Sequence, residues 1–198
     1  MTTYLPPVEK PRGVLINIVY LVSRRMFGKV PTGTKVFTAR MPSGFISFYN
    51  KTYALDKKLK LASATAMLVR QHVASINGCA FCMDAGRWFA LRESADNAAR
   101  MDALADYQTD PLITAAERAA LDYAGELTRS RKVAPDTFAT LGQFFSEREI
   151  CDIVRLVASE HLANLTNLGL NIGSEGLCDM PSATASRKAK KVVAPGRP

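Results

Sequence analysis

Two cysteines that lie three residues apart carry the clearest chemistry in this sequence. Cys79 and Cys82 form a Cys-Ala-Phe-Cys element directly after Asn77-Gly78. On a helix, residues i and i+3 share a face, so the two sulfurs can meet and form a disulfide. An Asn-Gly dipeptide favours a turn, which places the pair in the first turn of a new helix. Unpaired N–H groups and the helix dipole stabilise a thiolate there, as a dithiol–disulfide cycle requires. The alternative to redox chemistry is that both cysteines are small hydrophobic residues buried in the core.

The other two cysteines do not extend this pair into a metal site. A structural zinc needs a second cysteine pair or nearby histidines, and Cys151 and Cys178 stand apart from each other. Cys151 falls on an apolar helical face and is predicted to lie in the core, whereas Cys178 receives no role. We therefore expect no metal and no cofactor.

Proton transfer needs a group whose pKa lies near neutrality, and the sequence contains two histidines. His72 lies seven residues before Cys79, but the Asn-Gly turn separates them. His161 falls on the apolar face of a later helix beside Glu160. We take His72, Glu160 and His161 as the candidate bases. A buried core or interface histidine is the alternative for each ring.

Hydrophobic periodicity predicts helices along nearly the whole chain, with no alternation of strands and helices. A helix opens at Pro11, a broken helix covers 37–48, and a long helix runs from Asp56 to Ile76. The next runs from Cys79 to Glu93. Two capping-box patterns and a proline then predict three further helix starts, at Thr114-Ala-Ala-Glu117, Ser146-Glu-Arg-Glu149 and Pro135. The predicted fold class is an all-α helical bundle.

The size and charge of the chain limit its function. Its 198 residues suit one domain with extensions, here 1–54 as an N-terminal helical extension, 55–175 as the core domain and 176–198 as a basic tail. The net charge of +8 falls to +3 without residues 182–198, which contain five Lys and Arg and no acid. We therefore predict no specific nucleic-acid partner. No apolar run reaches the roughly 20 residues that span a membrane, and we see no signal peptide, so we expect a cytoplasmic protein.

Three segments resemble the carboxymuconolactone decarboxylase and alkyl hydroperoxidase AhpD superfamily. They are RQHVASINGCAFCMDA from Arg70 to Ala85, LITAAERAALDYA from 112 to 124, and SEREI from 146 with the helix that follows. The resemblance covers roughly residues 55–172. It implies an AhpD-like helical bundle that assembles as a homo-oligomer. It also implies reduction of organic hydroperoxides by Cys79 and Cys82, with electrons from a thiol or lipoyl-type reductant.

The sequence departs from the family at two positions. The family's peroxidases have a Glu where Met67 stands and a His where Gly86 stands, and both belong to the relay that activates the thiol. We therefore expect either slow peroxide turnover or a substitute relay, with His161 and Glu160 favoured over His72. Gly86 also predicts open space beside the thiols for a bulkier substrate. A non-catalytic or redox-sensing helical oligomer and a lactone decarboxylase-like enzyme remain alternative functions.

Overall fold

The computed structural model describes residues 2–178, and this part of the chain contains helices and no strand. The predicted all-α class is therefore confirmed. The predicted basic tail at 182–198 lies outside the described residues. The elements are α1 (Val14–Phe27), the π-helical turn η1 (Thr34–Thr38), α2 (Pro42–Asp56), α3 (Ser63–Ile76), α4 (Ala80–Glu93), α5 (Ala95–Asp102), the 3-10 turn η2 (Ala103–Asp106), α6 (Ala115–Ser130), α7 (Pro135–Gly142) and α8 (Glu147–Gly169).

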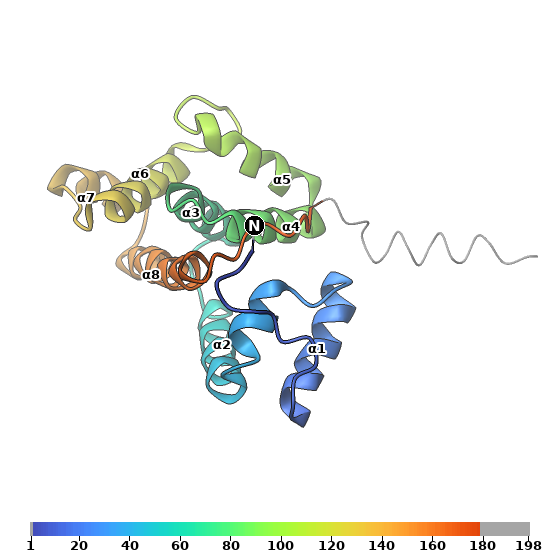
Figure 1. Ribbon diagram of the computed structural model, residues 1–198. Coiled ribbons are helices and arrows are strands. Elements are labelled where there is room, and N and C mark those ends of the chain that lie inside the picture. The colour runs from blue at the N-terminus through green and yellow to red at the C-terminus, as the bar shows by residue number, and fades with distance from the viewer. Residues whose placement is uncertain (1, 179–198) are drawn as a thin grey trace, which may run out of the picture.

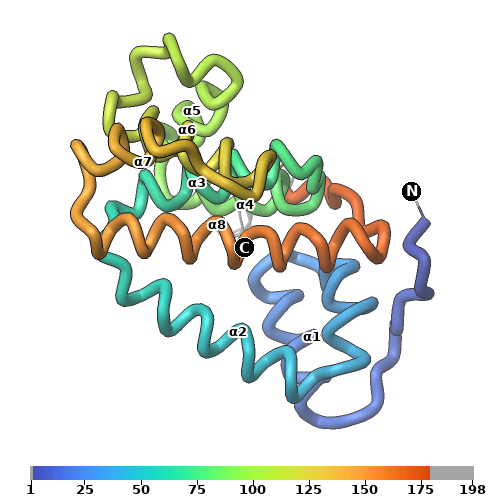
Figure 2. The backbone as a smooth tube through the Cα atoms, turned by 90° about the vertical axis from the view of Figure 1, so that its left-hand side faces the viewer, coloured from blue at the N-terminus to red at the C-terminus, as the bar shows by residue number. Residues whose placement is uncertain are grey.

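Helix α8 crosses the middle of the molecule, and other helices lie on both of its sides (Figures 1 and 2). Helices α3, α4, α6 and α7 pack on one side. Helices α1 and α2 lie on the other side in Figure 2, below α8 in that view. The main core forms where α3, α6 and α8 meet, and its fully buried side chains include Val69, Val73, Ala120, Ile153 and Leu156. This core holds α8 in place against the start of α4.

Several helices begin where local sequence signals predict. Thr114 and Ser146 each form a complete capping box, with Glu117 and Glu149 as the reciprocal acids. Pro135 is the first residue of α7. Each capping box pairs a backbone N–H group in the first turn that has no partner within the helix. Proline at the first position of α7 has no N–H group that would need such a partner. The starts of α6, α7 and α8 are therefore confirmed.

The predicted helix from Asp56 to Ile76 is wrong over residues 57–62. Helix α2 ends at Asp56, and α3 begins only at Ser63. The intervening segment is held by a distant residue, because the Asp152 carboxylate of α8 accepts the backbone N–H of Lys60 at 2.7 Å. A tertiary hydrogen bond thus replaces the helical bond that the local pattern favours.

The N-terminal part also differs from its prediction in detail. Helix α1 begins at Val14 rather than at Pro11, because Gly13 adopts a φ of 114° that breaks the helical path. The broken helix predicted over 37–48 appears as η1 followed by α2, with the break before Pro42. The division into domains at residues 54 and 175 stays a prediction. None of the described helices is both long enough and apolar enough to cross a lipid bilayer.

Candidate functional site

The cysteine pair lies at the start of α4. Gly78 adopts a φ of 68°, ends the path of α3 and turns the chain. Cys79 is then the N-cap of α4, and its Sγ accepts the backbone N–H of Cys82 at 3.3 Å. A disulfide joins Cys79 to Cys82. The predicted turn, helix start and disulfide are all present, and the helix N-terminus stabilises negative charge on Cys79 when the bond is reduced.

The two sulfurs differ in their access to solvent. Cys82 lines a cavity of about 520 Å³, which we call the cysteine chamber. Cys79 is only 1% exposed and does not line it. The chamber lies between α3, α4, α8 and the end of α2, and it is walled by aromatic and apolar side chains, among them Tyr49, Met67, Phe81 and Phe89. A molecule that enters this chamber meets Cys82 first.

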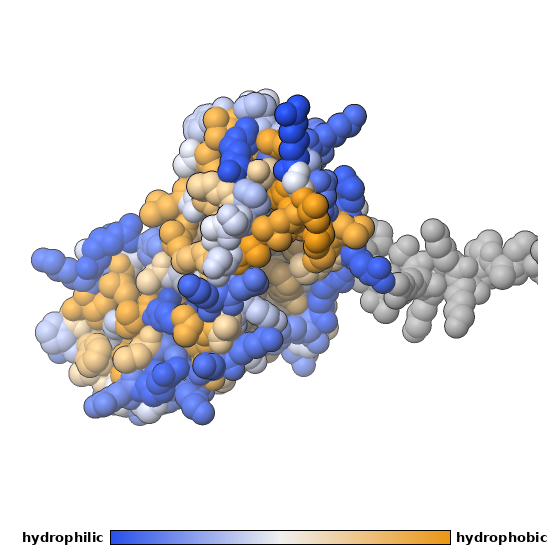
Figure 3. All heavy atoms as spheres, turned by 90° about the horizontal axis from the view of Figure 1, so that it is seen from below, coloured by the Kyte–Doolittle hydropathy of each residue, from blue (hydrophilic) through white to orange (hydrophobic). Residues whose placement is uncertain are grey.

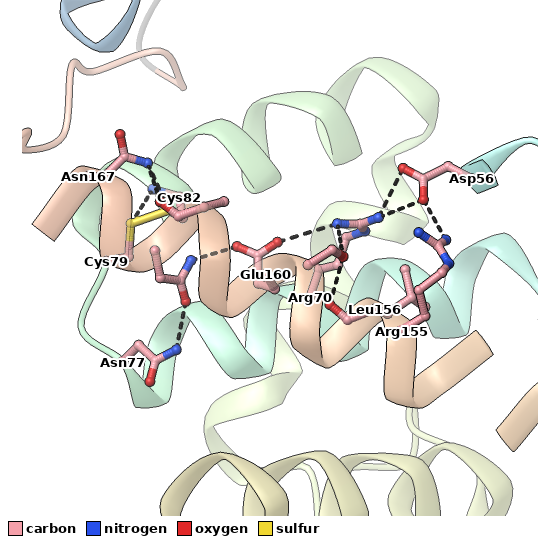
Figure 4. Close-up of polar contacts among 12 residues, drawn as sticks. Asp56, Arg70, Asn77, Cys79, Cys82, Arg155, Leu156, Glu160 and Asn167 are labelled. Carbon is pink, nitrogen blue, oxygen red and sulfur yellow. Dashed lines mark hydrogen bonds and ion pairs between the residues drawn. A yellow bond between two sulfur atoms is a disulfide. The ribbon is translucent and has the colours of Figure 1, made fainter. Parts of the chain in front are cut away.

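One face of α8 contributes polar groups to the chamber. Glu160, Ala163 and Asn167 follow one another at helical spacing along this face, and all three line the chamber. Asn167 Nδ2 donates to Cys82 Sγ at 3.4 Å, so an amide N–H points at the accessible sulfur (Figure 4). We did not predict Asn167 from the sequence. The only local indication that Asn167 belongs to the site was its position seven residues after Glu160, on the same face of the helix.

Glu160 is a buried carboxyl group in the wall of this chamber, with 8% of its surface exposed. Its Oε1 accepts from Asn164 Nδ2 at 2.7 Å, and its Oε2 lies 3.5 Å from the Arg70 guanidinium. Burial raises the pKa of Glu160 above its ordinary value, and the charge of Arg70 only partly opposes this effect. Glu160 therefore holds a proton more readily than an exposed glutamate does. Figure 4 shows the chain of contacts from Asn77 through Glu160 and Arg70 to Asp56.

His161 lies outside the cysteine chamber. Its Nδ1 is 3.2 Å from the Asn77 amide, and its Nε2 is 3.2 Å from the Arg131 guanidinium. Burial, followed by the charge of Arg131, lowers its pKa. Although His161 is next to Glu160 in the sequence, the helical turn directs the two side chains differently. The structure brings Glu160, and not His161, into the cavity that Cys82 lines.

His72 also lies away from the chamber. Its ring packs edge-on against Tyr107, with centroids 5.1 Å apart, and its buried Nε2 has no hydrogen-bond partner among the described residues. A Cβ added at Gly125 of α6 would approach this nitrogen at 2.9 Å, so His72 faces α6. Burial, followed by the charge of Arg129, lowers its pKa to about 4.

This buried neutral histidine predicts a loss of stability in acid. His72 titrates near 6.5 when unfolded and near 4 when folded, so the unfolded chain binds the proton first as the pH falls. We expect the free energy of unfolding to drop by up to about 3 kcal/mol between these two pH values. Urea unfolding of the wild type and His72→Phe should show a smaller loss for the variant over this interval. Parallel pH curves for the two proteins would contradict the assignment.

The two positions at which the sequence differs from the peroxidases that it resembles lie beside the chamber. Met67 and Gly86 both line it, from α3 and α4. The space predicted beside Gly86 is partly filled, because a Cβ there would collide with the Gln71 carboxamide. Gln71 Nε2 also donates to the Met83 carbonyl at 3.3 Å. Gln71 therefore occupies the space that Gly86 leaves free, and it adds a neutral polar group rather than a base.

The remaining cysteines do not join the pair. Cys151 is exposed on α8, so its predicted place in the core is wrong, because the apolar face of that helix turns away from it. Cys178 lies beside α4, where its thiol donates to the Asp84 carbonyl at 3.3 Å. Within residues 2–178, no group of three or more His, Cys, Asp or Glu side chains is arranged to hold a metal ion.

Sequence comparison finds one uncharacterised relative. The Escherichia coli K12 protein YnjA is 26% identical over 183 residues, which cover 89% of this chain and 97% of YnjA. No family model matches the sequence.

Comparison with solved structures finds similar folds in a debrominase and in a peroxidase-related protein. The apo debrominase Bmp8 superposes with a TM-score of 0.75 at 20% identity, over 89% of this chain and 94% of Bmp8. A cysteine-to-alanine variant of Bmp8 has also been solved in complex with 2,3,4-tribromopyrrole. A peroxidase-related protein from Ralstonia eutropha JMP134, described as an alkylhydroperoxidase AhpD core, superposes with a TM-score of 0.69 at 21% identity, over 87% of this chain and 95% of that protein.

Proposed function

We propose that this chain, which has the AhpD-like fold, is a thiol-dependent oxidoreductase that reduces organic hydroperoxides with Cys79 and Cys82. The observation that carries the proposal is the unequal placement of the two sulfurs. Cys82 lines the cysteine chamber, and Cys79 is buried behind it at the helix N-terminus. Cys82 is then the thiol that meets the substrate, and Cys79 is the thiol that resolves the product.

The reaction has two steps. The Cys82 thiolate attacks the outer peroxide oxygen, the O–O bond breaks, and Cys82 becomes a sulfenic acid while an alkoxide leaves. The Cys79 thiolate then attacks the Cys82 sulfur, the S–S bond forms, and hydroxide leaves as water after it takes up a proton. Overall, two thiols and one ROOH yield one disulfide, one ROH and one water.

Glu160 is the group that we assign to proton transfer. It shares the chamber with Cys82, and burial raises its pKa, so it can protonate the departing alkoxide. The resulting carboxylate can take the proton of the next Cys82 thiol. The N–H donor of Asn167 at Cys82 Sγ supports the thiolate that this transfer produces. Glu160 thereby serves as the substitute for the family's missing relay.

The disulfide has to be reduced after each turnover. We propose that a small thiol or a lipoyl-type dithiol enters the chamber and attacks Cys82 Sγ. Cys79 then leaves as a thiolate, which the first turn of α4 stabilises. A second thiol of the reductant releases Cys82, so that two reductant thiols become one disulfide and both cysteines are restored.

Reductive debromination of an aromatic compound is the second candidate reaction. Two observations favour it: the structural likeness to Bmp8, and the ring-walled chamber in which Met67 and Gly86 replace the peroxidase relay. In this reaction Ar–Br and two thiols yield Ar–H, HBr and one disulfide. The same two cysteines would supply both electrons.

Single-turnover chemistry tests the proposal and separates the two reactions. Protein that has been reduced and freed of reductant is mixed with cumene hydroperoxide or with 2,3,4-tribromopyrrole. We expect one cumyl alcohol per subunit and a disulfide between Cys79 and Cys82 by mass spectrometry. Bromide release from the pyrrole, with no alcohol from the peroxide, would favour debromination. If both thiols survive both mixtures, the protein is the non-catalytic helical oligomer instead.

Self-association and cytoplasmic location stay predictions. A homo-oligomer is supported by exposed apolar residues along α1, which include Val14, Ile18 and Leu21. Figure 3 shows apolar side chains gathered on the face seen from below, where α1 and α2 lie.

A further inference from the structure

A second cavity of about 490 Å³ adjoins the cysteine chamber, and we call it the aromatic chamber. It lies between η1, α2 and α8. Tyr49, Tyr53, Asp56, Arg70 and Ala163 line both cavities, so the two spaces meet along a common wall. Each volume falls in the range of about 300–1,000 Å³ that is typical of small-molecule sites. The two cavities therefore adjoin, with Cys82 in the lining of one and residues of η1, α2 and α8 in the lining of the other.

The lining of the aromatic chamber suits an uncharged apolar group. Phe37, Phe45 and Tyr49 form a row of rings, with successive centroids 4.7 and 4.3 Å apart. The lining contains two charged residues, and their charges cancel because Arg70 pairs with Asp56 at 3.0 Å. Asp56 also accepts from Arg155 at 2.6 Å, as Figure 4 shows. No unpaired charge in the lining is left to bind an ionic group.

Helix α2 supplies rings to this chamber without burying any of its own residues. Phe48 is 45% exposed and Tyr53 is 63% exposed, although both line the cavity. Large apolar side chains gathered around a cavity indicate that something apolar covers them. The common wall with the cysteine chamber favours the substrate itself as that cover.

We propose that the aromatic chamber binds the apolar tail of an elongated, uncharged organic substrate whose reacting end lies at Cys82. This inference rests on the proposed function and names its substrate class, a hydroperoxide with a long alkyl or aryl body. Tyr49 and Tyr53 contact the middle of such a molecule, where the two chambers meet. Small peroxides leave the aromatic chamber empty and lose that contact.

A series of n-alkyl hydroperoxides from ethyl to decyl tests the tail site in the wild-type protein. We expect kcat/KM to rise at least tenfold along the series. Gly44 lines the aromatic chamber, and a Cβ there would meet no atom within 4 Å, so we expect the backbone to accept Gly44→Trp, which adds an indole at the wall of the cavity. The variant should lower the decyl-to-ethyl ratio of kcat/KM at least tenfold. Gly142→Trp, at the equally open end of α7, is the matched control and should leave the ratio unchanged.

A binding measurement separates this inference from the proposed reaction. Equilibrium dialysis of 1-decanol needs no chemistry, and binding that Gly44→Trp weakens supports the tail site even if no hydroperoxide is reduced. Equal decanol binding by the wild type and Gly44→Trp, or a flat hydroperoxide series, would overturn it. Sedimentation tests the other possible occupant of the aromatic chamber, which is a second copy of this chain. If Gly44→Trp dissociates an oligomer and keeps the chain-length preference, the chamber is an interface between copies and the inference fails.

Discussion

Replacement of Cys82 by serine should reduce hydroperoxide consumption to the level of buffer alone. The reacting species is a thiolate, and a serine hydroxyl does not ionise near neutral pH, so the first step of the reaction is lost. Cys82 is the sulfur that lines the chamber and accepts from Asn167, so no other thiol is placed to take over. The measurement is peroxide consumption by the fully reduced variant under excess substrate.

Cys79→Ser should behave differently from Cys82→Ser. It keeps the reacting thiol and loses the resolving one, so we expect one equivalent of peroxide to be consumed per subunit before turnover stops. Dimedone should then label a sulfenic acid at Cys82, as mass spectrometry can show. Cys151→Ser is the matched control, because this thiol is exposed on α8 and outside the site. A burst from Cys82→Ser and none from Cys79→Ser would reverse the two roles.

Glu160→Gln is the second substitution with a large expected effect. It removes the proton that we assign to the departing alkoxide, and general acid–base help typically contributes about 10²–10⁴-fold. We therefore expect kcat to fall by roughly 100-fold or more. The amide can still accept from Asn164, so the local packing is kept. Glu147→Gln, on an exposed residue of the same helix, should leave kcat unchanged.

The stability of Glu160→Gln distinguishes a catalytic defect from a folding defect. The folded-state pKa of Glu160 is raised above its ordinary value of 4.5, so its contribution to stability is present below that pH and is lost as the pH rises. The variant should therefore gain stability relative to the wild type as the pH rises above 4.5. A variant that loses both activity and stability at neutral pH would contradict the assignment of Glu160 to proton transfer.

The sequence alone determined the parts of the site that depend on neighbouring residues. Asn77-Gly78 ends α3 because glycine reaches the left-handed conformation, with a φ of 68° at Gly78. Cys79 then caps α4, and the i, i+3 spacing brings Cys82 within disulfide distance. The capping boxes at Thr114 and Ser146 are equally local. Such signals act within one helical turn, so they can be read without knowledge of the rest of the chain.

Tertiary structure decided which of the candidate groups share a cavity with Cys82. Glu160 and His161 are adjacent in the sequence, yet the rotation of α8 places only Glu160 in the cysteine chamber. The same packing brings the Asn167 amide to the sulfur. Helix packing also explains the late start of α3 at Ser63, because the Asp152 carboxylate of α8 accepts a hydrogen bond from the backbone N–H of Lys60. The Asn167–Cys82 and Asp152–Lys60 contacts join residues 85 and 92 positions apart. Hydrophobic periodicity therefore predicts the helices, and only their packing on one another determines the chemistry between them.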